Sequence, residues 1–224
     1  MDIAGRVTLG RIVDRLRDCR LVDDIVVATS VSAADDAVEA WAKGEGVNVY
    51  RGSEDDVLAR VVEAQRALNS DIVVEICGDM PLLDPQIVDL AVQSFLANDC
   101  DVVTTVRVPS YPQGIDAEVF RLSALDEVKR TVTDPAVREH VSLYFYENPD
   151  NYRIVNLLAP ACWSWPEVRL QLDYPEDHIF LEAVYQRLEP AHGPTFGVGD
   201  VIALLQREPG LVEINRHCEE RAAR

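Results

Sequence analysis

The 224-residue sequence is poor in cations and has no long apolar run. It contains 21 Lys and Arg against 39 Asp and Glu, so its formal net charge is −18 and its pI is about 4.5. An acidic surface repels polyphosphate, which argues against a general binder of nucleic acid or anionic membrane. No stretch approaches the roughly 20 apolar residues of a membrane helix, and the first residues lack a signal-peptide core. We therefore expect a cytoplasmic protein with neither nucleic acid nor membrane as partner.

Several cysteine and glycine motifs are also missing. The five cysteines form no C-x-x-C pair and are scattered along the chain, at Cys19, Cys77, Cys100, Cys162 and Cys218. This spacing argues against a zinc motif or a disulfide framework and favours reduced thiols. The sequence contains no G-x-x-x-x-G-K-[ST], G-x-G-x-x-G or G-x-S-x-G. P-loop, dinucleotide-binding and serine-hydrolase functions therefore have no support.

What the first half does contain is a regular alternation of strand-like and helix-like segments. Short apolar runs typical of buried parallel strands lie at 25–28, 47–50, 72–76 and 102–106. Apolar residues at helical spacing predict helices near 9–21, 32–44, 53–68 and 85–96. Strands and helices joined by short connections are typical of an α/β fold with a doubly wound, mostly parallel, Rossmann-like sheet.

The second half is less regular. Alternation predicts a strand at 116–120, and further strands are expected at 153–158 and 168–172. Asp-Pro at 134–135 opens a helix that we expect to continue to Phe145, and Pro175 begins another helix. No linker or repeat interrupts the chain, so we predict a single domain over 1–224.

Two aspartates follow predicted strands at points where an α/β sheet binds ligands. Asp79 lies in the Gly-Asp-Met-Pro turn after the strand 72–76, and Asp173 lies in Asp-Tyr-Pro-Glu-Asp after the strand 168–172. Each residue has an ordinary alternative role, Asp79 in a turn and Asp173 as a helix cap. Together the two carboxylates could converge on one hard cation such as Mg²⁺.

Three other segments could contribute polar groups to the same edge. Ala28, Thr29 and Ser30 end the first predicted strand, where small residues and hydroxyls let a ring approach the backbone, although a plain strand-to-helix turn explains them equally well. Asp116 and Glu118 would share one face of their strand and could bind sugar hydroxyls, or lie on a solvated edge. His140 lies on a helix near the expected cleft, where simple packing is the alternative.

These segments occur in an order that resembles the cytidylyltransferase-like sugar nucleotidyltransferases. The resemblance is to the branch of spore coat polysaccharide biosynthesis protein SpsF, a relative of the acylneuraminate and 3-deoxy-manno-octulosonate cytidylyltransferases. The matching stretches are collinear and cover nearly the whole chain. They are IVVATS (25–30), VYRGSEDDVLAR (49–60), ICGDMPLLDP (76–85), YPQGIDAEVF (111–120), VREHVSLYFYENP (137–149), VRLQLDYPED (168–177) and LVEIN (211–215).

The resemblance implies a fold of the nucleotide-diphospho-sugar transferase type and an activity. A hydroxyl of an acidic sugar would attack the α-phosphate of CTP and expel pyrophosphate, in surface polysaccharide biosynthesis. Analogy with the family also suggests a homodimer. The resemblance implies that Asp79 and Asp173 hold Mg²⁺. It also implies that Ala28, Thr29, Ser30 and Gly78 lie along the nucleotide, and that Gln113, Asp116, Glu118 and His140 lie near the sugar.

The family pattern also has a first strand and a loop of the type A-R-x-x-S-x-R-x-P-x-K ahead of the position of Gly5. Only four residues precede Gly5 in this sequence. We favour the interpretation that the start is shortened, because both metal aspartates and the sugar-side motif are intact. The alternative is a degenerate, non-catalytic paralogue that acts as a binding or partner protein. A weaker alternative is a metal-dependent glycosyltransferase, whose sheet and strand-terminal aspartates look alike.

Overall fold

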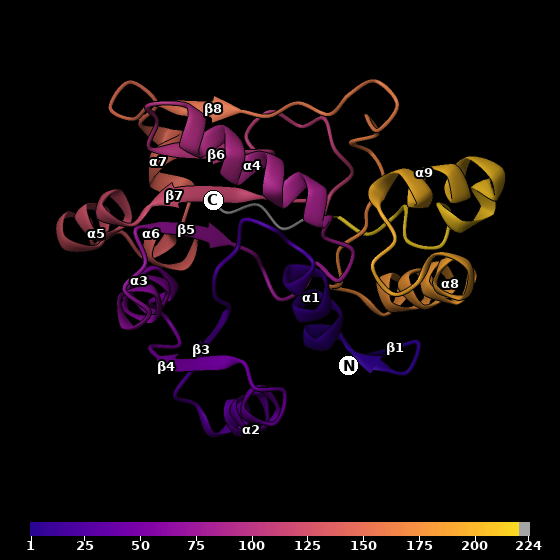
Figure 1. The fold of residues 1–224 in the computed structure, drawn as a ribbon, viewed down its shortest axis with the longest axis horizontal. Helices are drawn as coiled ribbons and strands as arrows, with labels where there is room; N and C mark the ends of the chain where they lie inside the picture. Colours follow the sequence, from indigo (N-terminus) through magenta and orange to yellow (C-terminus); the bar gives the residue numbers. More distant parts are fainter. Residues whose placement is uncertain (220–224) are drawn as a thin grey trace.

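Helices and strands alternate through the first half of the chain in the computed structural model, which describes residues 1–219 (Figure 1). The strands are β1 (Asp2–Ile3), β2 (Arg6–Val7), β3 (Val26–Ser30), β4 (Asn48–Gly52), β5 (Ile72–Glu75), β6 (Val102–Thr104), β7 (Glu118–Arg121) and β8 (Ile154–Asn156). The α-helices are α1 (Thr8–Arg17), α2 (Asp36–Gly44), α3 (Val57–Ala67), α4 (Pro85–Ala97), α5 (Leu122–Thr131), α6 (Pro135–Glu139), α7 (Leu143–Glu147), α8 (Pro175–His192) and α9 (Val198–Arg207). The expected α/β class is confirmed.

The larger sheet is mixed and has the strand order β5-β7-β6-β8. β7 runs antiparallel to both of its neighbours, whereas β6 and β8 are parallel. The chain therefore leaves β5, builds α4 and β6, and then returns to insert β7 between the two strands. As a result, the amino end of β7 lies beside the carboxyl end of β5, with Glu118 opposite Glu75.

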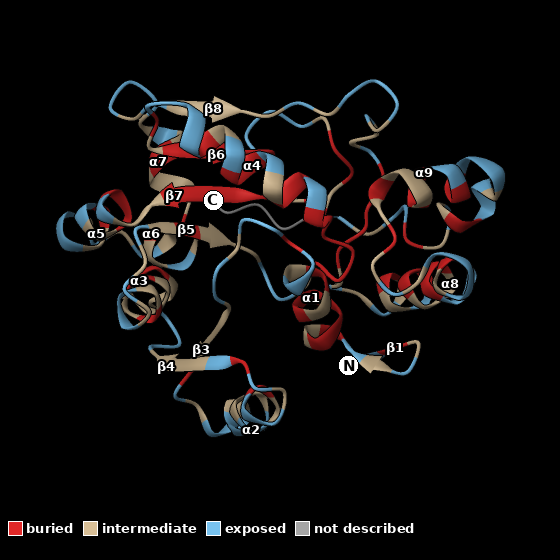
Figure 2. Cartoon of the chain, viewed as in Figure 1, coloured by how far each residue is buried: buried red, intermediate tan, exposed pale blue. Residues whose placement is uncertain are grey.

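Side-chain alternation on the strands gives this sheet two covered faces. Val103 and Val119 belong to an apolar cluster with helix α4, whereas Val102 and Phe120 belong to a cluster with α3, α5 and α7. All four of these side chains are fully buried, and buried residues run along the middle of the sheet in Figure 2. Burial on both faces explains why consecutive residues such as Val102 and Val103, or Val119 and Phe120, are apolar.

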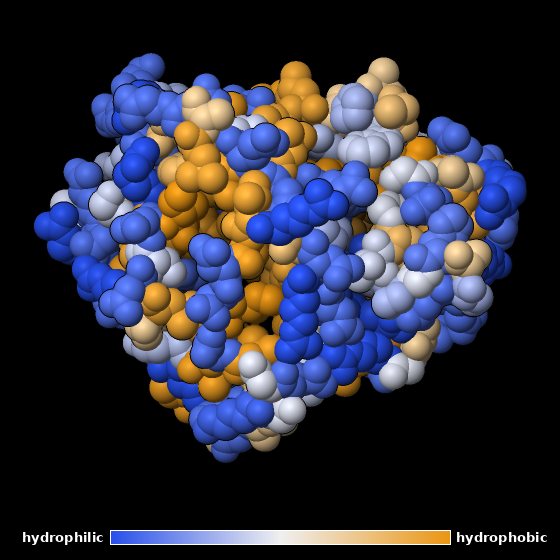
Figure 3. All heavy atoms as spheres, viewed as in Figure 1, coloured by the Kyte–Doolittle hydropathy of each residue, from blue (hydrophilic) through white to orange (hydrophobic). Residues whose placement is uncertain are grey.

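β3 and β4 form a separate parallel pair, away from the larger sheet. Among the described strands, β3 pairs only with β4 and β5 pairs only with β7. Between the outer edges of β3 and β5 runs an apolar groove of about 300 Å³, whose lining includes Val27 and Ala28 of β3, Val74 of β5 and Ile12 of α1. Apolar side chains are visible in the hollow at the middle of this face in Figure 3.

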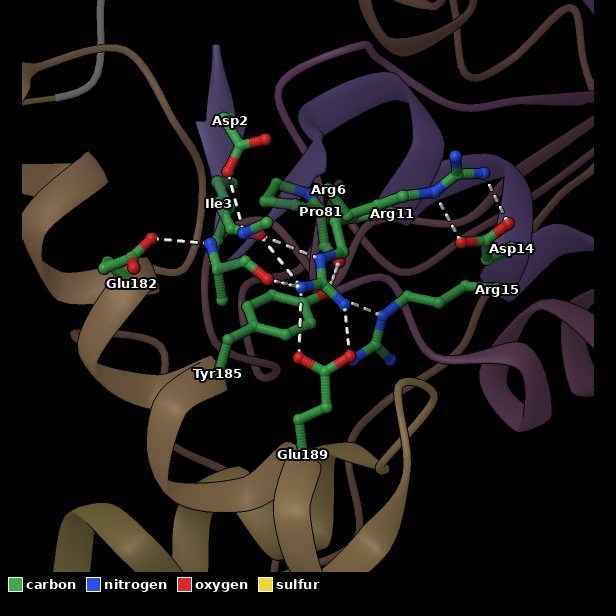
Figure 4. A network of polar contacts seen from close by, with 12 residues as sticks. Asp2, Ile3, Arg6, Arg11, Asp14, Arg15, Pro81, Glu182, Tyr185 and Glu189 are labelled. Atoms are coloured by element: carbon green, nitrogen blue, oxygen red, sulfur yellow. Dashed lines mark hydrogen bonds and ion pairs between the residues drawn. The ribbon is translucent and has the colours of Figure 1, made fainter. Parts of the chain in front are cut away.

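Two buried arginines of α1 connect the amino-terminal segment to α8 (Figure 4). Arg11 makes a bidentate pair with Glu189, at 2.7 and 3.0 Å, and also donates to the carbonyl of Ile3. Arg15 is 1% exposed, donates to the Tyr185 hydroxyl at 3.1 Å and stacks near its ring. Each planar guanidinium group can donate hydrogen bonds and stack on an aromatic ring at the same time. These contacts hold α1 in place, and α1 forms one wall of the groove.

Three details of the second half differ from the sequence predictions. The segment 168–172 is not a strand and forms only an isolated bridge between Arg169 and Gln113. The predicted helix from 135 to Phe145 is two short helices, α6 and α7, with a turn between them. The expected strand at 116–120 begins at Glu118 and runs antiparallel. No described helix is long and apolar enough to cross a membrane.

Candidate active site

The two predicted metal aspartates lie on segments joined directly through the backbone. β5 ends at Glu75, and the chain then turns through Gly78 and Asp79. The carbonyl of Asp79 accepts a hydrogen bond of 2.8 Å from the amide of Leu172, the residue before Asp173. Asp79 is half-buried and Asp173 is exposed. We call the edge of the fold where the turn after β5 meets the segment 168–173 the rim. The structure therefore brings together two segments that are more than ninety positions apart in the sequence.

A buried arginine holds the turn that carries Asp173. Arg169 is 4% exposed and bonds the fully buried Asp177 through Nε at 3.0 Å, and it also pairs with Asp173. Asp177 accepts from the amides of Asp173 and Tyr174 at 3.0 Å, which closes the first turn of α8. These bonds lower the pKa of Asp177 despite the opposing effect of its burial. The turn is therefore preorganised.

The predicted sugar-side motif lies against the same turn. The amide of Gln113 donates to the carbonyl of Val168 and its carbonyl accepts from Leu170, both at 2.8 Å. Gly114 follows with a φ of +89°, and a Cβ there would lie 2.7 Å from a backbone nitrogen of the neighbouring segment. A side chain at this position would force the two segments apart, so glycine is required for their close approach.

Four acidic side chains gather where β5 and β7 meet. Burial, and secondarily the neighbouring carboxylate of Glu118, raise the pKa of Glu75 to about 8, and Asp116 and Asp79 act on it in the same direction. Burial likewise raises the pKa of Glu118, which accepts a hydrogen bond from the Tyr146 hydroxyl. Glu118 was predicted to share with Asp116 a face that binds sugar hydroxyls, or else to lie on a solvated edge strand, whereas β7 is an inner strand of the sheet. In the structure Glu118 is 9% exposed and Asp116 is half-buried, so only Asp116 reaches the rim.

The predicted nucleotide residues fall into two groups. Ala28 and Gly78 both line the groove between β3 and β5, from opposite sides. The hydroxyls of Thr29 and Ser30 instead donate to Asp35, at 2.7 and 2.6 Å, and close the loop after β3. Any contact of Thr29 or Ser30 with a ligand would therefore compete with an existing internal bond.

His140 remains the least connected of the predicted residues. It follows the last residue of α6, and its amide donates to the carbonyl of Ala136 at 2.8 Å. Within residues 1–219 its half-buried ring makes no hydrogen bond or ion pair. Ser142, two positions further on, bonds Glu118, so this turn does reach the acidic rim through a neighbouring residue.

The carboxylate oxygens of Asp79, Asp173 and Asp116 are the hard ligands that Mg²⁺ prefers. Within residues 1–219 these three side chains do not form a group whose ligand atoms all lie within 4.8 Å of one another, so an ion would have to draw them together. Among the described residues, both bonds to the Asp173 side chain, from Arg169 and Gln171, go to Oδ2. The other oxygen of Asp173 can therefore face an ion while the arginine keeps the side chain in place.

Two side chains at the candidate site were not identified from the sequence. Glu75 has no sequence signal beyond an acidic residue in an apolar strand, and only the pairing with Glu118 shows its importance. Arg169 had a weak signal, namely a cation with aspartates four and eight residues later. Cys77 Sγ lies 3.7 Å from Glu75 Oε1, and this carboxylate raises the pKa of the thiol, which disfavours a nucleophilic role.

Comparison with known proteins agrees with this geometry. The cytidylyltransferase family model matches residues 1–188. The SpsF protein of Bacillus subtilis, named for spore coat polysaccharide biosynthesis, is 32% identical over 84% of this chain and 76% of its own. A 3-deoxy-manno-octulosonate cytidylyltransferase of Anaeromyxobacter is 31% identical over 68% of this chain and 57% of its own.

A solved structure extends the likeness to the fold. The cytidylyltransferase of Leptospira borgpetersenii superposes with a TM-score of 0.89 at 28% identity, over 99% of this chain and 90% of that one. The motif order, the rim of acidic residues at the strand ends and these matches all agree. This chain therefore belongs to the cytidylyltransferase family.

Proposed function

We propose that the protein transfers CMP from CTP to a hydroxyl of an acidic sugar, with release of pyrophosphate, in the synthesis of a surface polysaccharide. The observation that carries the proposal is the bond between Leu172 and Asp79, which places the Asp79 and Asp173 turns on one rim. The relatives support the sugar class, since they include a 3-deoxy-manno-octulosonate cytidylyltransferase and a protein named for spore coat polysaccharide biosynthesis.

Asp79 and Asp173 are the residues proposed to hold Mg²⁺. When bound, the ion would neutralise charge on the phosphoryl oxygens of the nucleotide. The protein would contribute mostly positioning and electrostatics, as is usual for phosphoryl transfer. Arg169 would keep Asp173 oriented, and Gly78 would lie near the ribose. Asp116 at the rim, with Gln113 beside it, would meet the sugar hydroxyls.

We further propose that the catalytic form carries a β-strand in the groove between β3 and β5. The outer edges of both strands face this groove, and its lining is largely apolar, as a central strand requires. Strand insertion would pair backbone groups that each cost about 1–3 kcal/mol if buried without a partner. The resemblance to the family suggests its first strand as the occupant, with the triphosphate loop following at the rim. In-frame codons for that strand and loop upstream of Met1 would support this assignment.

The test is pyrophosphate release with CTP and a panel of acidic sugars, using a form of the protein extended by the upstream in-frame codons. We expect release that requires both substrates and Mg²⁺. Asp79→Asn should reduce the rate by about 10²-fold or more, because Asp79 would hold the ion that stabilises the charge of the transition state. The thermal midpoint of unfolding should stay nearly unchanged.

The matched control is Asp150→Asn, because Asp150 is an exposed aspartate in a turn far along the sequence from either motif. It should leave the rate unchanged. No release from the extended form with any acidic sugar would contradict the proposed activity. A large fall in the melting temperature of Asp79→Asn would instead indicate a structural role for that carboxylate.

A further inference from the structure

A second ligand cluster lies behind the turn that carries Asp173. One carboxylate oxygen of Glu176, one ring nitrogen of His217 and the Sγ of Cys218 all lie within 4.8 Å of one another. His217 Nε2 is 3.7 Å from Glu176 Oε1. The three residues come from the first turn of α8 and from the carboxyl-terminal segment, so the sequence spacing of the cysteines gave no indication of them.

Hydrogen bonds from residues on either side of His217 and Cys218 hold the carboxyl-terminal segment in place. Asn215 is 2% exposed and donates to the carbonyl of Arg169 and to Asp177, at 3.1 and 2.8 Å. On the other side, the Tyr174 hydroxyl donates to the carbonyl of Glu219 at 3.1 Å. The amide of Cys218 donates back to the carbonyl of Asn215, which forms a turn. His217 and Cys218 are therefore held next to Glu176 by the surrounding structure.

We propose that Glu176, His217 and Cys218 bind one zinc-class transition metal ion, with water at the remaining position. A tetrahedral zinc ion with bonds of about 2.0–2.3 Å holds its ligand atoms roughly 3.3–3.8 Å apart. The 3.7 Å separation of the His217 and Glu176 atoms already fits this range, and a small side-chain rotation can bring in the sulfur. Imidazole and thiolate ligands disfavour Mg²⁺ and favour zinc, cobalt or copper.

Binding would link the carboxyl-terminal segment to the start of α8. The thiol of Cys218 loses its proton to solvent as the metal–sulfur bond forms, so each ion bound releases one proton if the imidazole is neutral. The net charge of −18 favours a cation at this position. The site is distinct from the pair of Asp79 and Asp173, because its ligands are mainly nitrogen and sulfur rather than oxygen.

The test is titration of the metal-free protein with Co²⁺, followed by displacement with Zn²⁺. We expect one equivalent of Co²⁺ to produce a near-ultraviolet thiolate-to-cobalt charge-transfer band, which Zn²⁺ then removes. Zn²⁺ should also raise the melting temperature. Cys218→Ser should lose the band and the rise in melting temperature, and His217→Ala should keep the band but require more Co²⁺ for saturation.

The matched controls are Cys162→Ser, at an exposed cysteine outside the cluster, and His192→Ala, at another exposed histidine. Both should give the same thiolate-to-cobalt band as the unchanged protein, and so should Asp79→Asn. Absence of the band in the unchanged protein would overturn the proposal. So would a band that survives Cys218→Ser or disappears in Cys162→Ser. If Cys218→Ser does not fold, unchanged Co²⁺ affinity in both His217→Ala and Glu176→Gln would overturn it as well.

Discussion

Replacing Glu75 by glutamine should stabilise the protein at alkaline pH. Glu75 lies opposite Glu118 across two paired strands, and burial together with that neighbour raises its pKa from 4.5 to about 8 in the folded protein. Between these two pH values the folded state holds a proton that the unfolded chain has released. The free energy of unfolding therefore falls as pH rises through this window, and it levels off above pH 8.

The size of the effect follows from the width of the window. Each pH unit contributes at most about 1.36 kcal/mol, so the shift at Glu75 sets an upper bound of about 5 kcal/mol. Interaction with Glu118 and local relaxation should reduce this value to roughly 2–4 kcal/mol. A glutamine at position 75 stays neutral, and its amide can donate a hydrogen bond toward Glu118.

Urea denaturation at pH 5, 6.5 and 8 measures this difference. Glu75→Gln and the unchanged protein should have similar unfolding free energies at pH 5, and the variant should be more stable by about 2–4 kcal/mol at pH 8. Glu213→Gln is the control, because Glu213 is an exposed carboxylate that pairs with Arg216 on the surface. A difference between Glu75→Gln and the unchanged protein that does not grow with pH would refute the reasoning.

Two further changes test the framework around Asp173. Arg169→Met leaves the buried carboxylate of Asp177 without its cation and should cost about 3–5 kcal/mol in urea denaturation, whereas Arg187→Met at an exposed pair should cost under about 1 kcal/mol. Equal losses would contradict the role given to the buried pair. Gly114→Ala should lower the melting temperature clearly more than Gly193→Ala, because both have positive φ but only Gly114 has backbone within 3 Å of the added Cβ. Similar shifts would show that conformation alone, rather than the close approach, requires glycine at 114.

The acidic rim also explains why an acidic protein can be suited to an anionic nucleotide. In the proposed function a divalent cation held by Asp79 and Asp173 would offset negative charge at this edge, so that nucleotide and ion would bind as a unit. Glu75, by remaining protonated near neutral pH, would limit the repulsion at this rim.

Much of the local structure and the family could be predicted from the sequence. Continuous apolar runs at 25–28 and 72–76 became β3 and β5, since strands buried on both faces need apolar residues at every position. Asp84 followed by Pro85 correctly predicted the start of α4, where the Asp84 side chain accepts from the amide of Gln86. The order of motifs correctly indicated the cytidylyltransferase family.

Which distant segments meet was decided only by the tertiary structure. Periodicity describes how a segment buries its own side chains, but it does not name the partner strand. The antiparallel insertion of β7 beside β5 therefore could not be foreseen, and with it the pairing of Glu75 and Glu118. The same holds for the bond from Leu172 to Asp79 and for the cluster of Glu176, His217 and Cys218. These contacts depend on long-range packing, in which each segment's position is set by all the others.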